Sequence, residues 1–169
     1  MSIEPQITVR AEQPYAAIPI KVTFREWGQA NALVAEVFGW LERNRITPAG
    51  PLFYRYRVIG GMDEKFDIEV GVPVAAPITG DGRVKADSIP GGPYAVLTHN
   101  GHPDRFQESF AVLEEWAKRQ NVRWANRVED GVEVWGGRFE FFLTNPADQP
   151  DPEQWSAEIA WLVEEGSAG

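Results

Sequence analysis

The chain has 169 residues, which fits one domain, and 43% of them are hydrophobic, which is enough for a substantial core. Its formal net charge of -9 opposes sequence-independent binding to DNA or to anionic lipid. There is no cysteine, which excludes disulfides, thiolate metal sites and cysteine nucleophiles. Neither an apolar N-terminal run nor a stretch of about 18 apolar residues is present, so we expect a cytoplasmic protein without a membrane partner.

The first half of the predicted single domain, about residues 7–74, reads as strand, helix, strand, strand. Its elements are, in chain order, extended segments within 7–22, a helix over about 24–44, and strands over 52–58 and 66–74. Pro19 restricts the second extended segment to a sheet edge or a bulge. Thr23 and Glu26 have the spacing of a capping box, and the apolar residues after them recur at helical spacing. The helix is therefore expected to begin directly after Thr23.

The second half, about residues 88–163, repeats this order after a loop rich in Pro, Gly and Asp over about 75–87. Its elements are a strand over 94–99, a helix, extended segments over 132–135 and 138–143, and a closing strand over 155–163. Asp104 is the expected cap of the helix. The repeated order predicts a duplicated α+β fold.

Each half ends in a strand with a glutamate at its middle, Glu69 in the first and Glu158 in the second. Two such units would share an antiparallel sheet, with helices on one face and an open groove on the other. Side-chain alternation predicts that Glu69 and Glu158 face this groove. Further candidate ligand-binding residues on neighbouring strands are Tyr54, Tyr56, Glu140, Phe142, Trp135 and Trp161. For the two tryptophans, groove and core are equally open.

Four motifs, in this order, resemble those of a known family. They are Asp67-Ile68-Glu69-Val70-Gly71-Val72-Pro73-Val74, Ile89-Pro90-Gly91-Gly92-Pro93-Tyr94-Ala95-Val96, His99-Asn100-Gly101 before a helix with a Glu115-Trp116 pair, and Phe139-Glu140-Phe141-Phe142-Leu143-Thr144-Asn145-Pro146 before Ala157-Glu158-Ile159. The chain resembles the GyrI-like small-molecule-binding proteins, which also occur as the effector-binding domain of AraC-type and MerR-type regulators. The resemblance spans nearly the whole chain, as a stand-alone form.

The resemblance implies two strand-helix-strand-strand modules related by a pseudo-twofold axis. It also implies a groove lined with aromatic residues and a buried glutamate, which binds lipophilic, often cationic aromatic compounds. The sequence departs from the family pattern where it reads Gly101-His102-Pro103, Phe142 and Ala160, positions at which family members often carry an aromatic residue or, in place of Phe142, a tyrosine. Regulators of this family carry a helix-turn-helix domain, and no basic recognition helix is recognisable here, so no nucleic-acid partner is expected.

Two main functions remain open from the sequence. The first is a binding module that sequesters or senses lipophilic aromatic cations. The second, which the resemblance alone allows, is a hydrolase that opens cyclopropane rings of DNA-alkylating natural products, with Glu158 or Glu69 as general base and Tyr54 or Tyr56 as acid or hydrogen-bond donor. The resemblance also allows an inhibitor of a topoisomerase-like protein. No metal is expected, because His99 and His102 lie at a turn without further ligands, and no cofactor is expected.

Overall fold

A computed structural model describes residues 4–60 and 64–164 of the chain. Within these residues all strands belong to one antiparallel sheet. The strands are β1 (Gln6–Arg10), β2 (Gln13–Val22), β3 (Phe53–Ile59), β4 (Phe66–Pro73), β5 (Lys85–Ile89), β6 (Gly92–Asn100), β7 (Asn126–Glu129), β8 (Val132–Trp135), β9 (Arg138–Phe142) and β10 (Ser156–Leu162). The α-helices are α1 (Trp27–Asn31), α2 (Leu33–Arg43) and α3 (Phe106–Gln120). None of the described helices is long and apolar enough to cross a membrane.

The strand order along the sheet is β1-β6-β10-β9-β3-β4-β2-β5, and the hairpin of β7 and β8 joins at β3. This order is symmetric about the β9–β3 seam, since β3, β4 and β2 of the first half correspond to β9, β10 and β6 of the second. The predicted α+β fold of two strand-helix-strand-strand modules is therefore confirmed. The axis of the repeat passes near the pair of Tyr54 and Glu140, which lie opposite each other across the seam.

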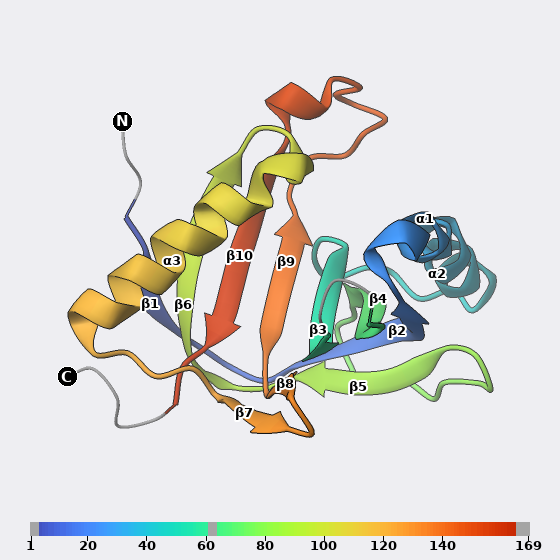
Figure 1. The fold of residues 1–169 in the computed structure, drawn as a ribbon. Coiled ribbons are helices and arrows are strands. Elements are labelled where there is room, and N and C mark those ends of the chain that lie inside the picture. Colours follow the sequence, from blue (N-terminus) through green and yellow to red (C-terminus); the bar gives the residue numbers. More distant parts are fainter. Residues whose placement is uncertain (1–3, 61–63, 165–169) are drawn as a thin grey trace.

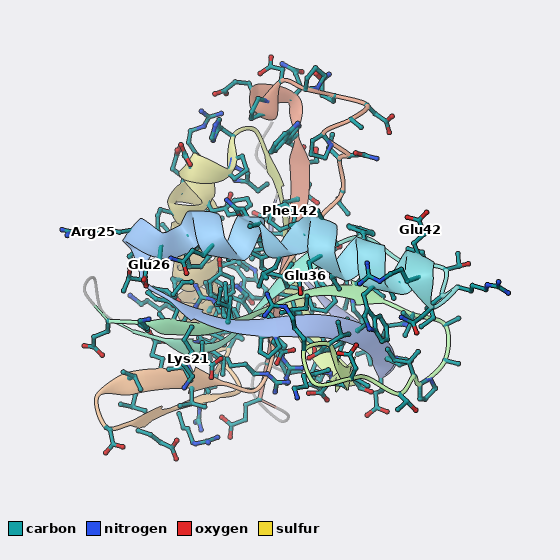
Figure 2. The ribbon with its side chains drawn as sticks, turned by 90° about the vertical axis from the view of Figure 1, so that its right-hand side faces the viewer. Lys21, Arg25, Glu26, Glu36, Glu42 and Phe142 are labelled. Carbon is teal, nitrogen blue, oxygen red and sulfur yellow. The ribbon has the colours of Figure 1, made fainter. Side chains whose placement is uncertain are left out.

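The helices lie over the outer strands of one sheet face and leave the two central strands uncovered (Figure 1). Helices α1 and α2 pack on β2 and β4, and α3 packs on β6. Two apolar cores result, one beneath each helical unit. Figure 2 faces the α1–α2 side and shows Arg25 and Glu42 pointing away from the ribbon at its two ends. Amphipathic helices are expected to lie this way, with the apolar side on the sheet.

The opposite sheet face carries a third apolar core, beneath the curled central strands. It contains Tyr15, Ala17, Phe53, Ile89, Tyr94, Phe139, Phe141 and Ala160. Gly71 allows this packing, because a Cβ at this position would lie 2.6 Å from Cζ of Phe53. The sheet thus buries apolar side chains on both faces.

Local signals in the sequence located the first helical unit well. The backbone N–H of Thr23 donates to Oε1 of Glu26 at 3.0 Å, as a capping box requires. The expected single helix over 24–44 is divided into a 3-10 turn (Phe24–Glu26), α1 and α2. Pro19 lacks a backbone N–H. It lies beyond the part of β2 that pairs with β5, so no hydrogen bond to β5 is lost at this position.

The expected cap of the second helical unit was wrong. His102, not Asp104, is the N-cap of the 3-10 turn before α3, and its Nδ1 accepts from the backbone N–H of Asp104 at 3.0 Å. Asp104 lies inside this turn. The turn begins two residues earlier than expected because Pro103 takes the first position, which needs no donor.

Candidate ligand-binding groove

A groove of about 1800 Å³ lies over the central strands β9 and β3, between α1–α2 on one side and α3 on the other. It opens on the face that carries the helices, so the expectation of a groove on the helix-free face was wrong. The physical reason is the spacing of the two helical units, each of which covers only the strands of its own half. The other face is filled by the third apolar core.

Glu140 and two tyrosines form the polar part of the groove floor. Oη of Tyr56 donates to Oε1 of Glu140 at 3.0 Å, and Oη of Tyr54 donates to Oδ1 of Asn31 at 2.5 Å. Glu140 comes from β9, and the tyrosines come from the neighbouring strand β3. Alternation along these paired strands places all three side chains on the groove face.

Glu140 is a carboxyl group almost without water contact, since only 3% of the residue is exposed. Burial raises its pKa from 4.5 to about 7, although the hydrogen bond from Tyr56 and the charge of Arg138 act in the opposite direction. Burial also raises the pKa of Tyr56, so this phenol stays a neutral donor at physiological pH. A carboxyl group with such a pKa changes its charge readily when a ligand brings or removes a nearby charge.

Arg138 enters the groove from the same strand, two residues before Glu140. Its guanidinium carbon lies 3.9 Å from the ring centre of Trp161, 4.7 Å from that of Trp135, 5.1 Å from that of Phe110 and 5.8 Å from that of Tyr56. We call these four rings the aromatic cage. Nε of Arg138 is buried and has no hydrogen-bond partner in the described part of the chain. A guanidinium stays protonated even here, although burial lowers its pKa.

The walls of the groove are mainly aromatic and come from every element around it. The aromatic side chains on the walls and rim are Phe24, Trp27, Phe38, Phe66, Phe106, Phe110, Phe142, Trp155 and Trp161. Phe24 is 50% exposed and Phe38 is 38% exposed, both at the α1–α2 side. Exposed aromatic rings that line a concavity are typical of a ligand-binding site.

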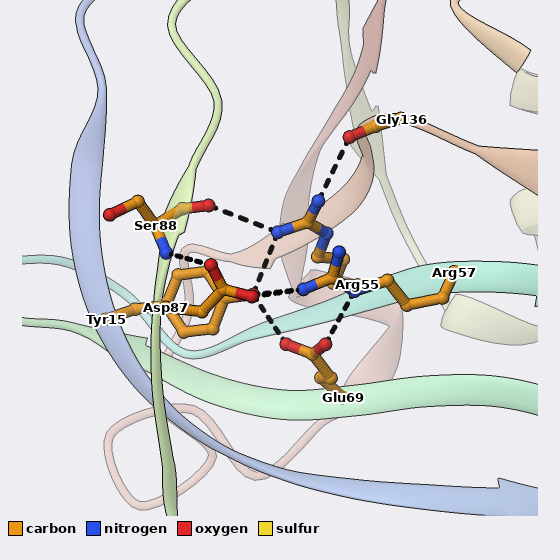
Figure 3. A network of polar contacts seen from close by, with 7 residues as sticks. All are labelled: Tyr15, Arg55, Arg57, Glu69, Asp87, Ser88 and Gly136. Atoms are coloured by element: carbon orange, nitrogen blue, oxygen red, sulfur yellow. Dashed lines mark hydrogen bonds and ion pairs between the residues drawn. The ribbon is translucent and has the colours of Figure 1, made fainter. Parts of the chain in front are cut away.

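Glu69 lies on the face opposite the groove, which corrects the expectation that it lines the groove. Its Oε2 accepts from Nε of Arg57 at 2.6 Å, and its Oε1 accepts from Oη of Tyr15 at 2.5 Å. Figure 3 shows the network that continues from there to Asp87 and to Arg55. The negative charge of Glu69 is thus already balanced by an arginine, and its oxygens already accept hydrogen bonds.

Glu158 also points away from the groove, and it forms an ion pair with Nη2 of Arg10 at 2.7 Å. The reason for both misplacements is register. Glu69 lies opposite Arg55 and not Tyr54, and Glu158 lies opposite Phe141 and not Glu140. Because side chains alternate, the two predicted sets of residues belong to opposite faces.

The other candidate residues lie in or beside the groove. Tyr54, Tyr56, Glu140, Phe142 and Trp161 line it. Trp135 is 3% exposed and belongs to the aromatic cage behind it.

Sequence reasoning named neither Arg138 nor Trp27 among the groove residues, although both line the groove. Arg138 had a usable signal, because a residue two positions from Glu140 on one strand shares its face. No comparable signal marks Trp27, because the apolar side of its helix contacts both the core and the groove.

The described residues contain no group of three or more His, Asp or Glu side chains that could hold a metal ion.

Solved structures with the same fold include regulators, a ligand complex and a hydrolase. The EcmrR chain in its DNA complex matches with a TM-score of 0.79 at 14% identity, over 95% of this chain and 57% of that chain. The isolated EcmrR C-terminal domain matches with a TM-score of 0.72 at 15% identity, over 97% and 99% of the two chains. This chain thus spans little more than half of full EcmrR.

Two further structures match over nearly the whole length of their chains. SAV2435, solved with bound tetraphenylphosphonium, has a TM-score of 0.57 at 15% identity, over 96% of this chain and 95% of that chain. A hydrolase from Listeria innocua has a TM-score of 0.61 at 12% identity, over 95% and 92%. At such identities these likenesses establish the fold alone.

A search of curated protein sequences finds no match. The model of the GyrI-like small molecule binding domain matches residues 3–164, which is almost the full length of the chain. The chain therefore belongs to the family of GyrI-like small-molecule-binding domains.

Proposed function

We propose that this protein binds bulky lipophilic aromatic cations in the groove and holds their positive charge beside Glu140. The observation that carries the proposal is a buried carboxyl group among aromatic walls, without an ion-pair partner within the described residues. A bound cation would supply that partner and favour the ionised carboxylate. Tetraphenylphosphonium, the ligand named for SAV2435, has this chemistry.

The size and composition of the groove favour broad rather than narrow recognition. Its volume of about 1800 Å³ exceeds the roughly 300–1,000 Å³ of usual ligand pockets. Each contact between a cation and an aromatic face contributes about 0.5–2 kcal/mol without demanding one exact ligand shape. These properties support a multidrug-type role in sequestration or sensing.

Two ions of nearly the same shape and opposite charge test the proposal. Calorimetric titration is expected to show micromolar binding of tetraphenylphosphonium, roughly -8 kcal/mol, and at least about tenfold weaker binding of tetraphenylborate. The cation is favoured because Glu140 can become its counter-ion, while the borate would oppose this carboxylate. Equal affinity for both ions would show that the groove binds by hydrophobic contact without selecting positive charge, and this would contradict the role of Glu140. Binding of neither ion would refute the proposal.

A hydrolase is the second candidate, and one observation favours it. Glu140 has a pKa of about 7 and accepts a hydrogen bond from Tyr56, which suits a general base that removes a proton from water. Glu140 replaces Glu69 and Glu158 in this role, because both are ion-paired outside the groove.

Mass spectrometry of a cyclopropane-bearing alkylating compound incubated with the protein would detect this activity. The expected product carries the mass of one added water and is not formed by a Glu140→Gln variant, which lacks the base. Glu158→Gln is the matched control and should keep the activity. If the compound is unchanged after hours of incubation with excess protein, hydrolase activity on that compound class is excluded.

A further inference from the structure

Arg138 is a buried charged group with an unused hydrogen-bond donor. Its side chain lines the groove, and its Nε is buried without a partner. Within residues 4–60 and 64–164, Nε of Arg138 finds no hydrogen-bond acceptor. The aromatic cage attracts the cation through the ring faces, but it offers no oxygen to the N–H groups. A buried donor without an acceptor is unfavourable, and a ligand oxygen would relieve this.

Arg138 also conflicts with a ligand that is only a cation. It lies two residues from Glu140 on the same strand face, so a positive ligand charge beside Glu140 would come close to a second positive charge. An oxygen acceptor on the ligand, placed at Arg138, would turn this repulsion into attraction. The pair of Glu140 and Arg138 thus presents a negative and a positive group side by side on the groove floor.

We propose that the groove takes amphoteric aromatic ligands, whose cationic part lies at Glu140 and whose carboxylate lies at Arg138. This inference rests on the proposed function and narrows its ligand class. The nearby acidic groups that oppose a free anion are Glu114, Glu133 and Glu140, which all act on Arg138. They make a lone carboxylate ligand unfavourable, so the carboxylate must come with a cationic partner on the same molecule.

Two rhodamine dyes test this ligand class, one with a free benzoic acid and the other with its methyl ester. They share one xanthylium cation and differ only in the acidic group. Fluorescence anisotropy at about pH 8 is expected to show at least about tenfold tighter binding of the acid. A charge-assisted bond from a guanidinium to a carboxylate is lost in the ester, and this loss sets the expected ratio.

Variants of Arg138 assign the preference to this side chain. In Arg138→Gln the ratio of ester to acid dissociation constants should fall at least about fivefold, and in Arg138→Lys it should fall less. Arg119→Gln, which removes the same charge from the exposed side of α3, should leave the ratio unchanged. Thermal melting of each variant confirms that the fold is kept.

The outcomes separate this inference from the proposed function. Binding of both dyes with the same ratio in the wild type and in Arg138→Gln would overturn the role of Arg138 and leave the cation site standing. Binding of the ester alone would also overturn it. If neither dye binds, the proposed function itself fails, and the inference fails with it.

Discussion

Replacing Glu140 with Gln is expected to weaken tetraphenylphosphonium binding at about pH 8 by a factor of about 10–100, or roughly 1.4–2.7 kcal/mol. The variant keeps the shape of the side chain and removes its charge. At about 5 Å and an effective dielectric constant of about 20, the attraction to the carboxylate is about 3 kcal/mol. The positive charge of Arg138 nearby subtracts part of this attraction, which is why the lower end of the range is included.

The same effect should disappear in acid. Ionised Glu140 is the form that attracts the cation, so wild-type affinity should rise with pH through about 7 and then level off. At about pH 5 the carboxyl group is protonated in the free protein, and wild type and Glu140→Gln should bind nearly alike. Calorimetry in two buffers of different ionisation enthalpy should also show proton release on binding near neutral pH.

Glu69→Gln and Glu158→Gln are the matched controls, because each removes one carboxylate from the opposite sheet face. Both should bind tetraphenylphosphonium within about threefold of the wild type, roughly 0.6 kcal/mol. A large loss of affinity in either control, with none in Glu140→Gln, would mean that Glu69 or Glu158 binds the cation instead of Glu140. It would then also require a rearranged sheet, since Glu69 and Glu158 are ion-paired in the present one.

The strands and the duplicated fold could be predicted from the sequence because their signals are local. Alternating apolar residues over 66–74 and over 155–163 mark β4 and β10 to within about two residues, which is the usual uncertainty. Capping chemistry at Thr23 marks the start of the first helical unit. Such signals depend only on neighbours in the chain.

The groove could not be assembled in the same way, because it depends on pairing between distant strands. A shift of one residue in the pairing of β3 with β4 would bring Glu69 to the face of Tyr54. Nothing in the local sequence fixes this register. The pairing of Tyr54 with Glu140 across the seam instead places Glu140 on the groove floor.

The resemblance to the GyrI-like family predicted a buried glutamate but not which one. Glu69 and Glu158 were attractive because they occupy equivalent positions of the two halves. Because their positions are equivalent, however, both side chains lie on the same sheet face. Each forms an ion pair with an arginine outside the groove. Glu140 corresponds in the repeat to Tyr54, so the groove floor is the place where the two halves differ.

Glu140→Gln is also expected to stabilise the free protein at about pH 8, on the order of 2–3 kcal/mol. In the folded protein the pKa of Glu140 is raised from 4.5 to about 7, whereas the unfolded chain ionises this group near its ordinary value. Between about pH 4.5 and about pH 7, ionisation of Glu140 therefore stabilises the unfolded state but not the folded state. The free energy of unfolding of the wild type falls over this range. Gln never ionises, and it can still accept the hydrogen bond from Tyr56.

Urea unfolding of wild type and variant at about pH 8 and about pH 5 measures this difference. The advantage of the variant should be largest at the higher pH and should shrink below about 1 kcal/mol at the lower pH, where folded Glu140 is protonated and the unfolded carboxyl group is only partly ionised. Glu69→Gln should show the opposite sign, because it removes the carboxylate charge that pairs with Arg57 and accepts from Oη of Tyr15. An advantage that does not change with pH would mean that Glu140 ionises normally. Under the proposed function, a bound cation would restore the stabilisation of the ionised carboxylate that burial removes.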